Sequence, residues 1–156
     1  MEAVAIDGLL GECLLQVAPA ATDEMVALHY EPTAPGIFVR ADRRRLTQVL
    51  NNLLSNAIKY NRPAGRVELS CMMTDDAQLK IVVSDTGVGI SSQDLPRLFT
   101  PFDRMGAPAS GIDGTGLGLT LSRDLLTAMG GTLHATSVEG IGSTFTVAIP
   151  LAGVAN

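Results

Sequence analysis

Three amides and one ammonium group fall on a single stripe of the periodic segment "LTQVLNNLLSNAIKYN". Residues in a helix advance by about 100° each, so positions i, i+4, i+8 and i+11 stay on one side. That spacing is shared by Gln48, Asn52, Asn56 and Lys59. A carboxamide oxygen suits Mg²⁺ and an ammonium group attracts phosphate, so the stripe could hold a metal–polyphosphate. The alternative is a solvated helix face, although such faces usually carry better helix formers than asparagine.

A carboxylate ends the alternating pattern "QLKIVVSDTGVGI". Asp85 has the same parity as the apolar residues Ile81 and Val83, so its side chain is expected on the apolar side of a strand. There it could accept a hydrogen bond from the amine of a ligand, while Gly87 and Gly89 would let a planar ligand approach the backbone. The alternative is that Asp85 caps the turn that follows, as aspartate often does.

A run of glycines leads directly into a helical pattern in "GIDGTGLGLTLSRDLL". Backbone N–H groups at a helix N-terminus form an anion site, and glycine lets a phosphate reach them. The run follows a loop and lacks a Gly-Lys-Ser/Thr ending, so it is neither a dinucleotide fingerprint nor a P-loop. Alone, it could equally be a flexible loop. Together with the amide stripe and Asp85, it indicates a site for Mg-ATP.

Helices and strands must position these groups. Helices are expected from Asp7 to about Ala18, where Pro19 disturbs the pattern, from about Arg43 to Tyr60 after a cap at Asp42, near 92–99, and over 117–129. Strand patterns cover 25–31, 36–41, 66–74, 78–85, 132–138 and 143–150, and the third and fourth read as a hairpin. This order does not alternate strictly, so we expect an α/β sandwich with helices on one face of a mixed sheet.

The composition of the chain excludes several classes of protein. A chain of 156 residues suits one domain, and 46% hydrophobic with 17% charged residues is globular rather than disordered. A net charge of -5 without a Lys/Arg run argues against a nucleic-acid partner, and no apolar stretch is long enough to span a bilayer. Cys13 and Cys71 match no metal or redox spacing, so free thiols in a reducing compartment are expected.

Four segments stand in order along the chain: "RLTQVLNNLLSNAIKYN", "SDTGVGI", "LFTPFDRMG", and "GTGLGLTLSRDLLTAMGG" with the closing "GSTFTVAIP". They resemble the N box, first glycine box, F box and second glycine box of the catalytic and ATP-binding domain of bacterial sensor histidine kinases. That superfamily also holds gyrase, mismatch-repair and chaperone ATPases. The resemblance covers almost the whole chain. It implies a Bergerat-type two-layer sandwich, in which about three helices cover one face of a mixed, mainly antiparallel sheet of about five strands.

The resemblance also implies site residues and a domain layout. Residues 1–156 would be one catalytic domain, with a mobile ATP lid at about 100–115. Asn56 would ligate Mg²⁺ with Asn52 beside it, Lys59 and Tyr60 would contact the nucleotide, and Asp85 would accept a hydrogen bond from the adenine amino group. The remaining predicted contacts lie around the adenine, at Gly87, Gly89 and Thr144, and around the phosphates, at Gly114, Gly116, Leu117, Gly118 and, from the lid, Arg104.

Some positions carry no predicted role. Asn51 matches none, and at Asn61 the family more often has Ser or Thr, a difference expected to matter little. The histidines of the chain, His29 and His134, both fall in strand patterns, where a structural role is expected. The phospho-acceptor histidine is therefore expected on a dimerisation domain that is absent here.

The predicted function follows from this resemblance. The domain would bind Mg-ATP and donate the γ-phosphoryl group to a histidine on separate dimerisation helices, with a response regulator downstream. A cytoplasmic location is expected, with no nucleic acid partner and no direct membrane contact. Two alternatives stay open: a related protein-serine kinase or anti-sigma factor, and a nucleotide-binding regulatory module without transfer activity.

Overall fold

Helices and strands follow closely from the periodicity of the apolar residues. The computed structural model describes residues 1–32, 35–99 and 115–154, except for the side chains of 115–118 and 154. The helices in these ranges are α1 (Ile6–Asp23), α2 (Arg43–Lys59) and α3 (Thr115–Ala128), with a 3-10 turn η1 (Leu95–Arg97). The strands are β1 (Glu2–Ala5), β2 (Ala27–Tyr30), β3 (Ile37–Ala41), β4 (Arg66–Met73), β5 (Gln78–Asp85), β6 (Thr132–Val138) and β7 (Gly142–Val154).

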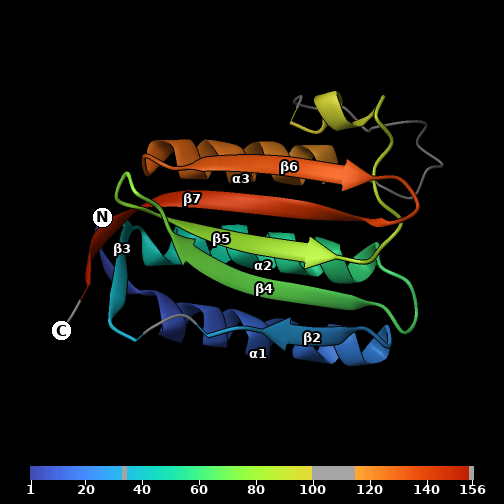
Figure 1. The fold of residues 1–156 in the computed structure, drawn as a ribbon, viewed down its shortest axis with the longest axis horizontal. Coiled ribbons are helices and arrows are strands. Elements are labelled where there is room, and N and C mark those ends of the chain that lie inside the picture. The colour runs from blue at the N-terminus through green and yellow to red at the C-terminus, as the bar shows by residue number, and fades with distance from the viewer. Residues whose placement is uncertain (33–34, 100–114, 155–156) are drawn as a thin grey trace.

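The strands form one sheet in the order β1-β3-β7-β5-β4-β2, with β6 also paired to β7. Every pair is antiparallel except β2 with β4, which is parallel. Figure 1 shows that α1, α2 and α3 all lie behind the same face of this sheet. The predicted two-layer sandwich with a mixed, mainly antiparallel sheet is therefore confirmed.

The number of strands differs from the prediction, because the sheet has seven strands and not about five. The sequence pattern missed β1, in which only Val4 is buried, so no alternation marks it. The segments predicted at 25–31 and 36–41 shorten to β2 and β3, which lie on opposite sides of the central strands. The presence of β1 and the bounds of β2 and β3 depend on pairing with strands that are distant in sequence, so the local pattern of residues does not reveal them.

The first helix continues past the residue expected to end it. Pro19 lies inside α1, whereas the predicted helix ended at about Ala18. Proline removes one helical hydrogen bond, but Val17 and Ala21 on either side are buried against the core and hold the helix together. Asp7 does not cap α1 as expected, because it lies in the first turn, where it accepts a hydrogen bond from the Tyr30 hydroxyl at 2.9 Å.

The second helix is the centre of the helical layer. Its predicted cap is confirmed, since Oδ1 of Asp42 accepts a hydrogen bond from the Arg45 N–H at 3.2 Å. It packs on both other helices and on β4 and β5, through its buried residues Leu46, Val49, Leu50, Leu53, Leu54, Ala57 and Ile58. Asn51 donates a hydrogen bond to Gln16 of α1, so this asparagine joins two helices.

The two cysteines are free thiols, as predicted. Cys13 is buried in α1, and Cys71 is partly buried in β4. Burial raises the pKa of Cys13 to about 11 and that of Cys71 to about 12. Both are therefore protonated at neutral pH.

The packing of α2 leads to a stability prediction. Leu50 is fully buried, so Leu50→Ala should lower the free energy of unfolding by about 2–5 kcal/mol, from lost burial and the cavity left behind. Leu15 on α1 is 77% exposed, so Leu15→Ala should change it by about 0.5 kcal/mol or less. Urea unfolding of both variants checks the prediction, and equal losses would contradict the described core.

Candidate functional site

Four segments lie together at one end of the sandwich, and three of them carry predicted site residues. Figure 1 shows the C-terminal end of α2, the tip of β5, the turn between β6 and β7, and the start of α3 at this end. Backbone hydrogen bonds join three of them: the Val88 N–H donates to the Tyr60 carbonyl at 3.1 Å, and the Gly140 N–H donates to the Val88 carbonyl at 2.7 Å. Segments distant in sequence therefore form one surface.

Asp85 places a half-buried carboxylate on this surface. Its Oδ1 accepts hydrogen bonds from the N–H groups of Gly87 at 2.8 Å and Ser143 at 3.3 Å. Burial raises the pKa of Asp85, and the two N–H groups partly offset that rise. Oδ2 makes no hydrogen bond within the described ranges. Oδ1 thus caps the turn, which is the first of the two predicted roles. A hydrogen bond from a ligand amine to Oδ2, the second predicted role, stays a prediction.

Gly87 and Gly89 occupy positions where a side chain would collide with backbone. A Cβ atom on Gly87 would lie 2.4 Å from the Tyr60 carbonyl oxygen and 2.9 Å from Oδ1 of Asp85. Gly89 has φ +72, and its Cβ would lie 2.2 Å from the Val138 carbonyl oxygen. Both glycines are therefore required by the close approach of the segments that surround Asp85.

The predicted stripe on α2 is only partly exposed to solvent. Gln48 and Lys59 are exposed, and Nζ of Lys59 lies 5.3 Å from the centre of the Tyr60 ring. Asn52 is half-buried and donates a hydrogen bond to the Ser122 hydroxyl of α3 at 3.2 Å. Asn56, also half-buried, makes no side-chain hydrogen bond to the described residues. A solvated helix face accounts for Gln48 and Lys59, but not for the two half-buried asparagines between them.

The donor chemistry at Asn56 is compatible with a magnesium ion. Its carboxamide oxygen is a neutral ligand, half-buried and uncommitted within the described part of the chain. No three His, Cys, Asp or Glu side chains come together there as an all-protein metal site. Mg²⁺ commonly takes few protein ligands and completes its shell with phosphate oxygens and water, so a single amide could serve it beside a polyphosphate.

The strand register brings Ser143, and not Thr144, next to Asp85. Asp85 pairs with Ser143, and Ser84 pairs with Thr144. Successive residues of a strand point to opposite faces, so Thr144 lies on the other face, with its hydroxyl 3.1 Å from that of Ser84. A contact between Thr144 and the adenine therefore stays a prediction, and the register puts Ser143 in the better position for it. A shift of one position separates the two residues, and only the pairing with β5 fixes it.

Ser143 belongs to a small hydroxyl cluster that the sequence did not reveal. It is 7% exposed, and its hydroxyl lies 2.9 Å from that of Ser137 on β6. The Ser137 hydroxyl in turn accepts a hydrogen bond from the N–H of Ile90 at 2.7 Å. These bonds fix the loop after Asp85 to the ends of β6 and β7.

Several predicted site residues lie in parts of the chain that are described incompletely or not at all. Arg104 and Gly114 lie in residues 100–114, outside the described ranges, and so does nearly all of the predicted lid. Gly116, Leu117 and Gly118 lie at the start of α3, where only the backbone is described. Their contact with phosphate stays a prediction.

The arrangement matches a known family of proteins. A model of the family described as "Histidine kinase-, DNA gyrase B-, and HSP90-like ATPase" matches residues 41–153. The chain belongs to this family. Membership in this ATPase family implies ATP binding, and the matched range contains Asn56, Asp85 and the glycines around them.

Curated relatives are sensor kinases. Sensor protein GacS of Pseudomonas syringae pv. syringae is 41% identical over 151 residues, or 92% of this chain. Sensor histidine kinase RcsC of Escherichia coli (strain K12) is 44% identical over 124 residues, or 79% of it. The chain spans 16% of the length of the first relative and 13% of the second. The similarity therefore concerns one part of much longer proteins.

Solved structures agree with this relationship. The catalytic domain of histidine kinase ThkA is 25% identical, with a TM-score of 0.82 over 96% of this chain and 98% of that one. Full-length ShkA, solved in complex with AMPPNP, is 31% identical, with a TM-score of 0.83 over 99% of this chain and 32% of that one. The resemblance to histidine-kinase catalytic domains, predicted from four motifs, is confirmed.

Two glycines provide a matched pair for testing the packing around Asp85. Both Gly89 (φ +72) and Gly140 (φ +83) have left-handed backbone, which penalises alanine by roughly 1–2 kcal/mol. Only at Gly89 would the new Cβ also meet backbone, because nothing lies within 4 Å of that position at Gly140. Gly89→Ala should therefore destabilise the chain more than Gly140→Ala in urea unfolding. Equal effects would show that the segments are less closely packed than described.

Proposed function

We propose that this chain binds Mg-ATP where α2 and β5 end and donates the γ-phosphoryl group to a histidine on a separate dimerisation domain, in two-component signal transduction. The observation that carries the proposal is the half-buried Asp85 carboxylate, with Oδ1 held by two backbone N–H groups. Its second oxygen is available to accept a hydrogen bond from the adenine amino group. Family membership supports the nucleotide, and the similarity to sensor kinases supports the histidine acceptor.

The proposed contacts divide between the two ends of the nucleotide. At the base, Asp85 accepts a hydrogen bond from the amino group, and the backbone of Gly87 and Gly89 lies close to the ring. At the phosphates, Asn56 ligates Mg²⁺, Asn52 supports it, and the Lys59 ammonium pairs with phosphate charge. Further contacts are proposed for Tyr60, Gly114, Gly116, Leu117 and Gly118, and for Arg104 at the γ-phosphate.

The chemistry asks little of the protein beyond positioning and charge. An imidazole nitrogen of the acceptor bonds to the γ-phosphorus, the bond from that phosphorus to the β–γ bridging oxygen breaks, and ADP leaves with the electron pair. A magnesium ion, when bound, neutralises the phosphate oxygens. Such transfers are accelerated mainly by in-line alignment and by cations near the developing charge. In this proposal, Lys59 supplies a positive charge near the phosphates, and Asp85 binds the far end of the nucleotide.

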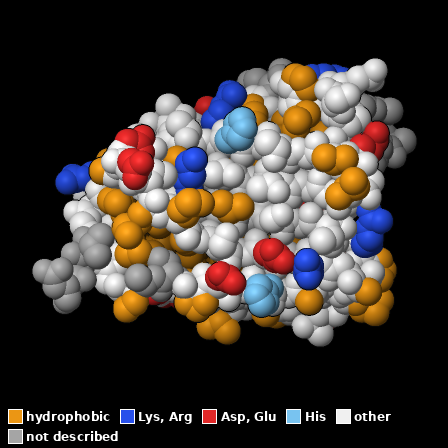
Figure 2. Space-filling view, viewed as in Figure 1, with side chains coloured by type: hydrophobic (Ala, Val, Ile, Leu, Met, Phe, Trp, Pro, Cys, Tyr) orange, Lys and Arg blue, Asp and Glu red, His pale blue; other side chains and the backbone are white. Residues whose placement is uncertain are grey.

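The acceptor is proposed to come from outside this chain. His29 on β2 and His134 on β6 are both exposed on the helix-free face of the sheet, which Figure 2 shows. Asp85 shares the parity of the buried Ile81 and Val83, so it points to the opposite, helix-covered face. Neither histidine therefore lies on the side of the sheet where the nucleotide is proposed to bind.

The proposed setting is that of a sensor kinase. Partners would be the dimerisation helices of its own or another kinase, with a response regulator downstream and no nucleic acid. A cytoplasmic location without direct membrane contact of this domain is part of the proposal. Among the described residues, no helix is long and apolar enough to cross a membrane.

Transfer of radiolabelled γ-phosphate tests the function. The chain is mixed with Mg-ATP and candidate dimerisation hairpins that carry a histidine. Label on the hairpin that is lost in acid but survives base is expected, since phosphohistidine has that stability. Acid-stable, base-labile label would instead identify a protein-serine kinase, and ATP binding without any transfer would favour a regulatory module.

Asp85→Asn separates binding from folding. Loss of one hydrogen bond to a charged group costs about 1.5–3 kcal/mol, so the affinity for ATP should fall roughly 10- to 150-fold in calorimetry. Stability without nucleotide should not fall at neutral pH. A raised pKa means that the folded state disfavours the ionised carboxylate, and the amide oxygen can still accept the N–H groups of Gly87 and Ser143. Unchanged ATP affinity would refute the adenine assignment.

Asn56→Ala tests the metal. The affinity of the wild-type chain for ATP should rise when Mg²⁺ is added, and the variant should lose most of that rise, because the protein ligand to the ion is gone. Asn51→Ala on the same helix is the control, since Asn51 is bonded to Gln16 of α1. Calorimetry with and without Mg²⁺ measures both. A full magnesium effect in the Asn56 variant would exclude this ligand.

A further inference from the structure

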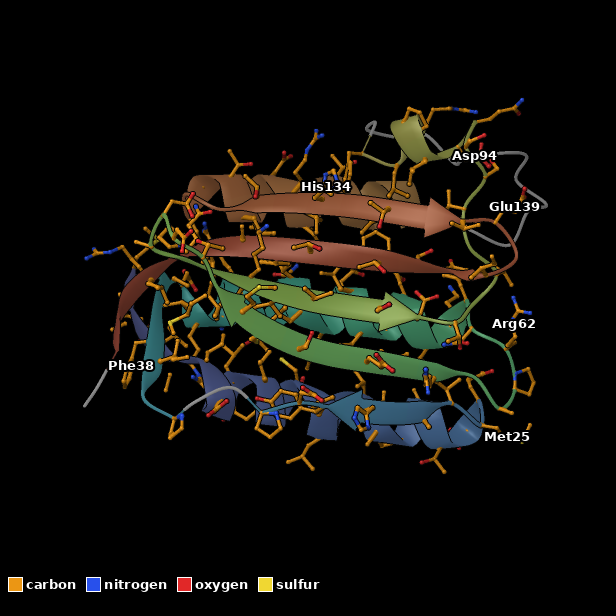
Figure 3. The ribbon with its side chains drawn as sticks, in the orientation of Figure 1. Met25, Phe38, Arg62, Asp94, His134 and Glu139 are labelled. Atoms are coloured by element: carbon orange, nitrogen blue, oxygen red, sulfur yellow. The ribbon has the colours of Figure 1, made fainter. Side chains whose placement is uncertain are left out.

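One long side chain adds to the backbone hydrogen bonds that join the segments around Asp85. Nη2 of Arg62 donates hydrogen bonds to the Gly87 carbonyl and to the Gly140 carbonyl, each at 2.9 Å. Arg62 itself follows the end of α2, whereas Gly87 lies after β5 and Gly140 in the turn between β6 and β7. Figure 3 shows Arg62 at the same end of the sandwich as the tip of β5 and the labelled Glu139 of that turn.

The bond to Gly87 connects Arg62 directly to the carboxylate. The carbonyl of Gly87 accepts from Arg62, and the N–H of the same residue donates to Oδ1 of Asp85 at 2.8 Å. A Cβ atom at Gly87 would lie 2.4 Å from the Tyr60 carbonyl oxygen, so little space separates this loop from the end of α2. A guanidinium that holds Gly87 from one side therefore restrains the donor that holds Asp85 on the other.

Asn61 fixes the backbone from which Arg62 reaches out. Its Oδ1 accepts hydrogen bonds from the Arg62 N–H at 2.9 Å and from the Thr86 hydroxyl at 3.2 Å, and its Nδ2 donates to the Arg66 carbonyl at 3.0 Å. The amide carries its acceptor and its donor on separate atoms and so reaches partners on two sides, whereas a Ser or Thr hydroxyl accepts and donates through a single oxygen. The asparagine that was expected to matter little thus joins α2, β4 and the loop after β5.

We propose that Arg62 is a positioning residue that, supported by Asn61, sets the Asp85 carboxylate for recognition of the nucleobase amino group. It acts through Gly87 and touches neither the base nor the phosphates. This inference rests on the proposed function. According to this inference, specificity for adenine over other bases depends on Arg62 and Asn61 after α2 as well as on Asp85.

A variant of Arg62 should therefore be impaired only in its recognition of the amino group of the base. If the loop after β5 loosens, the carboxylate loses its alignment with the donor on the base, but contacts to sugar and phosphate remain. A variant of Arg62 should therefore lose affinity for ATP while binding a nucleotide without the amino group almost as before. A residue with a general structural role would weaken both nucleotides alike.

Calorimetry with two nucleotides tests this on the whole chain. The probes are Mg-ATP and the Mg complex of purine riboside triphosphate, which has hydrogen in place of the 6-amino group. The wild-type chain should prefer ATP. Arg62→Ala should lower the affinity for ATP about 10-fold, the effect of one well-aligned hydrogen bond, and that for the analogue less than about 2-fold. Arg62→Lys should keep part of the preference, since an ammonium group can donate to both carbonyls.

Arg66→Ala is the matched control. The Arg66 guanidinium pairs with Glu68 through Nε at 3.2 Å, and only backbone atoms of Arg66 bond to Asn61 and Thr86. This variant should keep the wild-type preference for ATP. Thermal unfolding shows whether Arg62→Ala is folded, and if it is not, a reduced preference in Arg62→Lys takes its place as the decisive result.

Each outcome bears on a different claim. A preference that falls in the Arg62 variants and survives in Arg66→Ala supports the inference. A preference that stays at the wild-type level in Arg62→Ala, or equal losses for both nucleotides, overturns it and leaves the proposed function intact. Absence of any preference in the wild-type chain would instead refute the role of Asp85, and with it the inference.

Discussion

The site depends on the carboxylate of Asp85, which is half-buried. Burial disfavours the ionised form of Asp85 and raises its pKa, so the carboxylate needs donors around it. Two backbone N–H groups supply them, one from the turn after β5 and one from the paired strand β7. Because these donors are backbone atoms, their positions are set by the sheet and the turn. The other contacts at this end of the sandwich keep the backbone of these two donors in place.

The sheet and α2 provide the rigid support. β5 lies between β7 and β4, so the strand that carries Asp85 is hydrogen-bonded on both sides. The helix-facing residues Leu79, Ile81 and Val83 on that strand are completely buried. This fixes the direction of β5 and brings its tip against the end of α2, where Gly87 leaves no room for a side chain. A preorganised acceptor of this kind loses little entropy when it binds a ligand.

Much of the fold was predictable because its signals are local. The cap at Asp42, the hairpin of β4 and β5, and the parity of Asp85 all depend on spacing within one element. The bounds of β6 matched the predicted 132–138. By contrast, β1 pairs with a strand more than 30 residues away and buries one side chain, so its own pattern carries almost no signal.

The parts of the site that escaped prediction depend on contacts between elements. Ser143 and Thr144 are neighbours of similar chemistry, and only the register with β5 determines which one faces Asp85. Arg62 follows a helix end, where an arginine usually suggests a solvated loop, yet its guanidinium bonds to two distant carbonyls. No local pattern records such partners. Sequence motifs indicated the ligand, whereas the structure shows how the carboxylate that is proposed to bind it is held.

The most direct measurement is an NMR titration of the ¹⁵N-labelled chain with a non-hydrolysable ATP analogue and Mg²⁺. If the nucleotide binds as proposed, the largest shift changes will be at the backbone N–H groups of Gly87 and Ser143 and at the side-chain amide of Asn56. These report the two ends of one bound nucleotide. Changes confined to the helix-free face, around Ser84 and Thr144, would contradict the proposed binding and place the ligand on the other side of the sheet.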